Sequence, residues 1–237
     1  ADTISTTYGE VKVDAATNIT LTGNLVGGTN LELTTDPTQL GSVTLGGTVS
    51  SQNIDIETNN LVLQTIDTLA LTQDLNGNAG DIELQFSGYS TSSGTLNLLA
   101  QGTGTGDGGD IHVINNSSSL AGIATGDNFT FNASATGSGD AGSMRFESLG
   151  DVTVGSGGFT ATGASGGFAS IEAGGNVTVN GGINVAGSNG SGAGIVLSAG
   201  NDGSGSLFLN DTSFLSTANA TGNNGDGGVI DLAGERI

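Results

Sequence analysis

A glycine-rich turn that leads directly into a short alternating strand recurs along this chain. The clearest copy, GTGTGDGGDIHVIN, covers residues 102–115. In it Ile111 and Val113 can point to one side while His112 and Ile114 point to the other, the period of two that a β-strand imposes. Further copies begin at residues 76 (NGNAGDIEL), 138 (SGDAGSMRF), 163 (GASGGFASI), 189 (NGSGAGIVL) and 224 (NGDGGVIDL). Six copies of one unit predict a repeat architecture.

One glycine in each copy serves as a marker of the repeat: Gly80, Gly109, Gly142, Gly167, Gly194 and Gly228. Successive markers are 29, 33, 25, 27 and 34 residues apart, and one or two more short strands lie in each interval. Two or three strands per interval is what one coil of a β-helix needs. The unequal intervals place the variation in length in the turns, where insertions cost least. We therefore interpret the six glycines as structural turn residues.

Residues 1–75 show the same alternation with shorter turns. The run QNIDIET at 52–58 is followed by NNLVLQT at 59–65 with no gap in which the chain could reverse. A chain that bends without reversing can stack its strands in parallel, coil upon coil, at about 4.8 Å. We predict an all-β fold, one parallel β-helix (β-solenoid) domain over residues 1–237. It would have regular short-strand coils at 1–75, Gly-rich coils at 76–237, and roughly eight to eleven coils over about 40–50 Å.

Composition and charge narrow the functions that such a chain can have. Only 35% of the residues are hydrophobic and 4% aromatic, which suits a thin core lined by Val, Ile and Leu. Three basic residues against 23 acidic ones exclude nucleic acid and anionic membrane surfaces as partners, because both bind through Lys and Arg. No run approaches the roughly 20 apolar residues of a membrane span, so we expect no membrane insertion. Without Cys there is no disulfide and no thiol chemistry.

The repeats resemble the β-helical shafts of large secreted bacterial adhesins of the filamentous-haemagglutinin type. The resemblance rests on GNAGDIEL (77–84), GDGGDIHV (106–113), GDGGVIDL (225–232) and the run GGNVTVNGGINVAG (174–187). It implies a right-handed parallel β-helix and an extracellular or cell-surface location. The first residues, ADT, also look like what remains after cleavage behind an Ala-x-Ala site, so we expect an exported chain from which the signal peptide is already absent.

Residues able to carry out chemistry are few. His112 is the only histidine, and the alternation places it on the outer face as a surface residue. Arg145 and Glu147 alternate with Met144 and Phe146, which a solvated ion pair explains. Neither a nucleophile–His set nor the clustered carboxylates of a polysaccharide-degrading β-helix can be assembled around them. We expect no catalytic residues and no enzyme activity, and His/Cys metal sites are ruled out.

Acidic residues in the glycine turns raise calcium as an alternative ligand. They are Asp107, Asp110, Asp140, Asp202 and Asp226. Calcium-binding β-rolls need GGxGxD every nine residues, and the marker spacing is about three times longer. Calcium therefore stays possible only as a surface property, and we expect no other cofactor.

Asparagines near strand starts suggest one more structural device. They are Asn18, Asn30, Asn53, Asn60 and Asn176. Such residues either stack as amide ladders along a corner or simply form turns.

These features predict a non-enzymatic, adhesin-like or fibre-forming shaft. Because the end coils of a solenoid expose unpaired strand edges, we expect the shaft to associate end to end into filaments. The alternative is a surface module that binds a host or surface glycan or calcium, with a polysaccharide-degrading enzyme a distant third.

Overall fold

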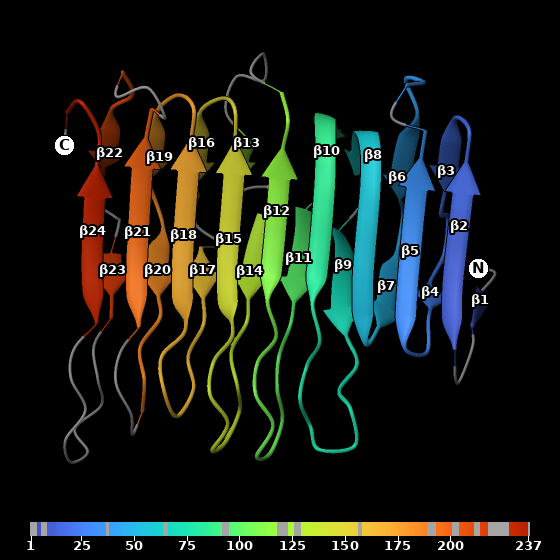
Figure 1. The fold of residues 1–237 in the computed structure, drawn as a ribbon, viewed down its shortest axis with the longest axis horizontal. Coiled ribbons are helices and arrows are strands. Elements are labelled where there is room, and N and C mark those ends of the chain that lie inside the picture. The colour runs from blue at the N-terminus through green and yellow to red at the C-terminus, as the bar shows by residue number, and fades with distance from the viewer. Residues whose placement is uncertain are drawn as a thin grey trace.

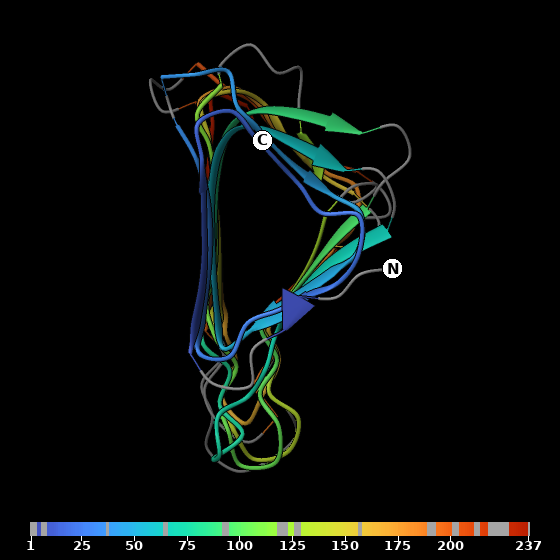
Figure 2. The ribbon, with the colours of Figure 1, turned by 90° about the vertical axis from the view of Figure 1, so that its right-hand side faces the viewer.

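The computed structural model is built entirely from short β-strands in the part of the chain that it describes, with no helix there. That part comprises residues 4–5, 9–36, 38–63, 66–91, 95–117, 123–125, 129–155, 158–188, 193–200, 204–210, 214–217 and 228–236. The strands form three sheets, arranged around a three-sided cross-section (Figure 2). The predicted all-β class is therefore confirmed.

The long sheet runs the length of the molecule and faces the viewer in Figure 1. Its main path has nine strands: β2 (Glu10–Ala15), β5 (Asn30–Thr35), β8 (Asn53–Leu63), β10 (Ile82–Thr91), β12 (Ile111–Asn115), β15 (Ser143–Ser148), β18 (Phe168–Ala173), β21 (Gly194–Ala199) and β24 (Val229–Ala233). Neighbours in this path are separated by one or two other strands in the sequence, so the chain leaves the sheet after each strand and returns one position further along.

The second sheet lies behind the long one and also has nine strands: β1 (Ile4–Ser5), β4 (Leu25–Val26), β7 (Thr48–Ser51), β9 (Ile66–Leu71), β11 (Thr95–Leu99), β14 (Phe129–Asn132), β17 (Phe159–Thr160), β20 (Gly182–Asn184) and β23 (Phe214–Ser216). The third side is formed by β3 (Asn18–Thr20), β6 (Ser42–Leu45), the second halves of β8 and β10, and then β13 (Ile123–Thr125), β16 (Val152–Val154), β19 (Val177–Val179) and β22 (Leu207–Leu209).

Every strand pair in the described residues is parallel, and each joins equivalent positions of successive repeats. Ile82 pairs with Ile54 on one side and with Ile111 on the other. The prediction that strands stack in parallel without hairpins is confirmed, and the nine strands of the path fall within the predicted eight to eleven coils. The two runs at 52–58 and 59–65 join in one strand, β8, which bends from the long sheet onto the third side.

The core fills the space between the sheets. Inward residues alternate with outward ones, as in β12, where Ile111 and Val113 are buried. The predicted Val, Ile and Leu lining is present, and one continuous cluster extends from Ile19 to Leu207. Five fully buried phenylalanines widen it in the middle of the chain: Phe86, Phe129, Phe131, Phe146 and Phe159.

Candidate functional site

All the marker glycines except Gly194 lie where the backbone of the preceding coil approaches closely. A Cβ added to Gly109 would lie 1.6 Å from the carbonyl oxygen of Gly80 in the preceding coil. The same Cβ at Gly142 would lie 2.0 Å from the oxygen of Gly109, and at Gly167 2.2 Å from that of Gly142. None of these three residues has a positive φ. Glycine is needed here because the backbone of the neighbouring coil occupies the space of a side chain.

Gly194 lies one position away from this column. Since Ala169 pairs with Ile195, the residue level with Gly167 is Ala193, and Gly194 is already the first residue of β21. A Cβ on Gly194 would come no closer than 3.1 Å, and then to the ring of Phe168. Gly228 returns to the column, with the oxygen of Ala193 1.7 Å from its added Cβ.

Asn and Asp side chains connect the coils near the start of the long sheet. Asn53 Oδ1 accepts the backbone N–H of Asp81 at 3.1 Å, and Asp81 Oδ1 accepts that of Asp110 at 3.2 Å. Asp110 Oδ1 in turn accepts the N–H and the hydroxyl of Ser143 at 2.9 and 2.7 Å. Each side chain therefore satisfies a backbone donor of the next coil, as an N-cap residue does for a helix.

Two similar series lie elsewhere on the coils. Asn78, Asp107 and Asp140 each accept the N–H of the next coil, ending at Ser165. On the third side Asp151 accepts from Asn176, which accepts from Ser206. We call the three series the Asx ladders. Of the asparagines expected to form a ladder, Asn18, Asn53 and Asn176 each accept a backbone N–H of the next coil. Five of the eight accepting side chains in the three series are aspartates.

Removing one acceptor from an Asx ladder tests its contribution. We expect Asp110→Ala to lower the free energy of unfolding by about 1–2 kcal/mol, because two donors of Ser143 lose a charged acceptor. Asp110→Asn keeps the oxygen and is expected to cost less than half as much. Urea unfolding of both variants measures the difference. Equal losses for the two would show that the carboxylate acts through its charge and not as an acceptor.

The Asx ladders involve several of the aspartates that could bind calcium. Asp107, Asp110 and Asp140, three of the turn acids considered for calcium, each use Oδ1 to accept a backbone N–H. Asp202 and Asp226 lie outside the described residues. Within the described ranges, no group of three or more His, Cys, Asp or Glu side chains is placed to hold a metal ion.

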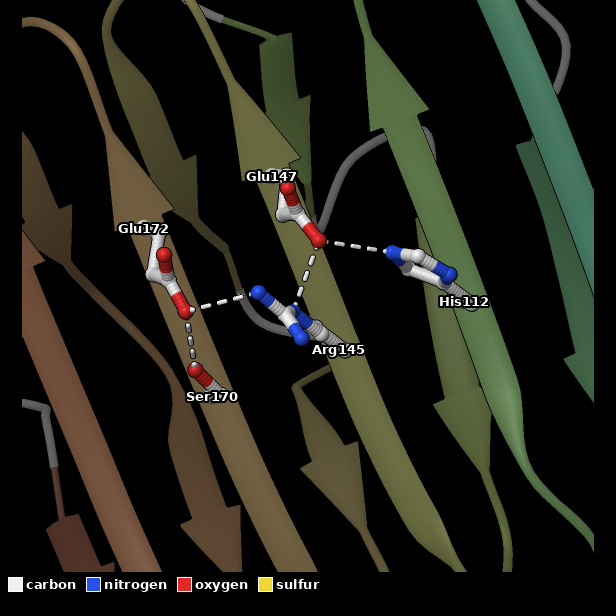
Figure 3. Close-up of polar contacts among 5 residues, drawn as sticks. All are labelled: His112, Arg145, Glu147, Ser170 and Glu172. Atoms are coloured by element: carbon white, nitrogen blue, oxygen red, sulfur yellow. Dashed lines mark hydrogen bonds and ion pairs between the residues drawn. The ribbon is translucent and has the colours of Figure 1, made fainter.

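A polar cluster on the outer face of the long sheet joins three neighbouring strands (Figure 3). Glu147 Oε1 lies 2.7 Å from Arg145 Nε on the same strand, which confirms the predicted ion pair, and 2.8 Å from His112 Nε2 on β12. Arg145 Nη2 reaches Glu172 Oε1 on β18 at 3.2 Å. His112 is one-third exposed, on the outer face as predicted.

The surroundings of this cluster form a shallow depression of about 80 Å³, lined by Ile114, Asn115, Asn116, Glu147, Ser148, Leu149 and Glu172. Both carboxylates are paired with Arg145, and Glu147 also contacts the His112 ring. The cluster therefore connects β12, β15 and β18 on the outer face of the long sheet.

Nearer the N-terminus the same outer face is crowded with negative charge. Glu32 pairs with Asp55 and Asp55 with Glu83, which places three acids side by side on β5, β8 and β10. Partial burial raises the pKa of Asp55, and the charges of Glu83, Glu32 and Glu57 raise it further. In contrast, Asp74 accepts hydrogen bonds from Asn78 and Asn76, which lower its pKa.

Asp55 and Asp74 are expected to affect stability with opposite dependence on pH. The folded state holds the proton of Asp55 more tightly than the unfolded chain, so its ionised form costs stability as pH rises above about 4. Asp55→Asn should therefore raise Tm at pH 7 and leave it unchanged at pH 3. Asp74 stabilises the fold above its unfolded pKa and loses this effect as pH falls, so Asp74→Asn should lower Tm at pH 7. Thermal unfolding measured from pH 3 to pH 7 gives the direction of the change in Tm for both variants.

Comparisons with known proteins found no match: no family model, no curated protein and no solved structure is similar to this chain. The resemblance to filamentous-haemagglutinin-type adhesins stays a prediction. In the residues that the structure describes, no helix is long and apolar enough to span a membrane.

Proposed function

We propose that this chain is a non-enzymatic extracellular shaft, adhesin-like or fibre-forming, built as a right-handed parallel β-helix. The observation that carries the proposal is the in-register stacking of the nine strands in the path of the long sheet, each paired in parallel with the next. An array of this kind extends along one axis and presents side faces of constant width, which is the geometry of a spacer or a fibre.

Two features support a mechanical role. Adjacent coils are joined by backbone hydrogen bonds along the long sheet and the second sheet, and on the third side from β3 to β10 and from β13 to β22. The Asx ladders add side-chain bonds between the same coils. The side faces carry scattered acidic residues, and the chain has a formal net charge of −20. Such charge keeps the sides of neighbouring molecules apart and favours association at the ends.

A separate observation supports the right-handed sense of the β-helix. In Figure 1 the strands of the long sheet point upward on the near side while successive coils advance from right to left. A screw that turns and advances in this way is right-handed, and crossover connections between parallel strands almost always have this hand.

The location and role are tested on the cells that produce the protein. Antibodies raised against the folded chain, used for immunogold electron microscopy of intact cells, are expected to label surface fibres or projections. Label confined to the cell interior would contradict the proposal. Antibody absorbed beforehand with the purified chain serves as the control.

The alternative is a surface module that binds calcium or a glycan, and its calcium arm can be tested by thermal stability. A ligand that binds only the folded state raises Tm, so calcium is compared with magnesium at equal ionic strength. For a shaft we expect the two cations to raise Tm equally, by screening alone. A rise that is specific to calcium would favour the binding module.

A further inference from the structure

The two edge strands of the long sheet each leave backbone groups facing outward. Val229 N–H donates to the oxygen of Ala193 on the preceding coil. Alternate residues of a parallel strand bond to opposite neighbours, so the N–H groups of Ile230 and Leu232 point away from β21. At the other end of the sheet, one edge of β2 pairs with β5, and in the described residues no strand pairs with its opposite edge. In the described residues β24 and β2 thus present complementary, unpaired ladders.

The register of the sheet indicates what would fit onto β24. Inside the molecule, the N–H groups of Ile54 and Ile82 donate to Asp81 and Asp110, each the residue just before the inward partner in the next coil, and both bonds measure 2.9 Å. Ile230 occupies the same column, and Val11 begins it. If the column continued into a second copy, Ile230 N–H would donate to Glu10, and Leu232 N–H to Lys12.

Exposed apolar side chains at the C-terminal edge indicate that a further strand packs over this edge. Ile230 lies in the inward column but is 42% exposed, whereas Ile195, its partner one coil earlier, is fully buried. Leu209 on β22 lies in the inward column of Val179 and is 42% exposed. At the opposite edge Val11 and Val13 are only partly buried against the core. Continuing the inward columns would place Val11 over Ile230 and Val13 over Leu232.

The charges at the two edges are complementary. Lys12 and Asp231 are the first and last members of one outer column, so continuing it places Lys12 beside Asp231. Lys12 already contacts Glu32 on its inner side at 2.6 Å, and its side chain is 48% exposed. It is the only lysine in the chain. The pairing therefore sets the sole lysine between two carboxylates.

We propose that a second copy of this chain docks head to tail, adding its β2 to β24 as a further parallel strand. Ile230 and Leu232 would be covered by Val11 and Val13, and Asp231 would pair with Lys12. β1 of the second copy would continue the second sheet beyond β23, since Ile4 and Leu215 lie in one column of that sheet. This inference rests on the proposed shaft function and specifies its end contact. The contact is heterologous and does not close, so it generates filaments.

Charge reversal at the two edges tests the contact by sedimentation velocity over a range of concentrations. Wild type is expected to form elongated species that grow with concentration. Asp231→Lys sets two lysines against each other, and Lys12→Glu sets two acids against each other. Each substitution should raise the dissociation constant, Kd, of self-association at least tenfold. Mixed in equal amounts, the two variants present opposite charges wherever one variant docks on the other, so alternating filaments should form with an affinity close to that of wild type.

Asp55→Lys is the matched control, because it makes the same charge change in the same column, away from both edges. Like Asp231→Lys it reduces the net negative charge, so weaker self-association of Asp231→Lys alone cannot come from general repulsion. Ile230→Pro removes the outward N–H without breaking a bond to β21, and it should also block growth. Circular dichroism confirms that each variant is folded.

The outcomes separate this contact from the function on which it rests. Filaments that persist unchanged in Asp231→Lys and Ile230→Pro would overturn the β24–β2 contact and leave the shaft function standing. Wild type that remains monomeric at every concentration would overturn it as well. Surface fibres absent from producing cells would instead count against the shaft itself.

Discussion

Replacing Gly109 with alanine is expected to lower the free energy of unfolding by about 3 kcal/mol or more. The new Cβ would lie 1.6 Å from the carbonyl oxygen of Gly80, a backbone atom that cannot move without shifting the coil to which it belongs. Overpacking of this kind costs about 1–3 kcal/mol where flexible side chains can adjust, and a rigid backbone neighbour places the cost at the upper end. Urea unfolding followed by circular dichroism measures the change.

Gly194→Ala provides the matched control for this prediction. Gly194 belongs to the same repeat motif, but its added Cβ would meet only the edge of the Phe168 ring, at 3.1 Å. We expect a change below about 1 kcal/mol, because a partly exposed side chain can move aside. Equal effects of the two substitutions would show that glycine acts in this motif through backbone flexibility rather than through close approach of the coils.

Replacing Phe131 with alanine is expected to cost about 3–5 kcal/mol, the usual range for a fully buried phenylalanine. Its ring stacks on Phe159 with centroids 4.2 Å apart and planes at 7°, and meets the edge of Phe146 at 5.9 Å. No part of the side chain reaches solvent. The deletion would therefore open a cavity between the coil of Phe131 and the next coil, which carries Phe146 and Phe159. Urea unfolding measures the loss.

Phe208→Ala is the control, since this side chain is 49% exposed and loses little burial. We expect it to cost less than about 1 kcal/mol. A loss for Phe131→Ala as small as that for Phe208→Ala would mean that the phenylalanine cluster is not a packed core in solution.

Much of the fold could be predicted from local sequence, because a solenoid repeats the same short pattern of strand and turn in every coil. The alternation around Ile111 and Val113 fixes which residues face inward, and the absence of a gap between residues 58 and 59 excludes a hairpin. The same alternation placed His112 outside and paired Arg145 with Glu147, as the structure has them.

Contacts between coils could not be predicted in the same way. They depend on the register of the strands, that is, on which residues about 20 to 35 positions apart in the sequence become strand partners. The turns differ in length, so the markers Gly167 and Gly194 are 27 residues apart while the coils repeat after 26, from Ala169 to Ile195. For the same reason the stacking of Phe131 on Phe159 and the acceptance of Ser143 N–H by Asp110 only become evident once the strands are in register.

The parallel stacking of coils is tested most directly by distances along one outer column. The chain has no cysteine, so pairs of introduced cysteines can be spin-labelled without background. Thr34 lies in the same column as Glu147, Glu172 and Ser198, which follow it by four, five and six strands. Electron–electron double resonance is expected to give about 19, 24 and 29 Å, one strand spacing of about 4.8 Å for each added coil. Distances that fail to rise by this constant step would contradict the stacked array.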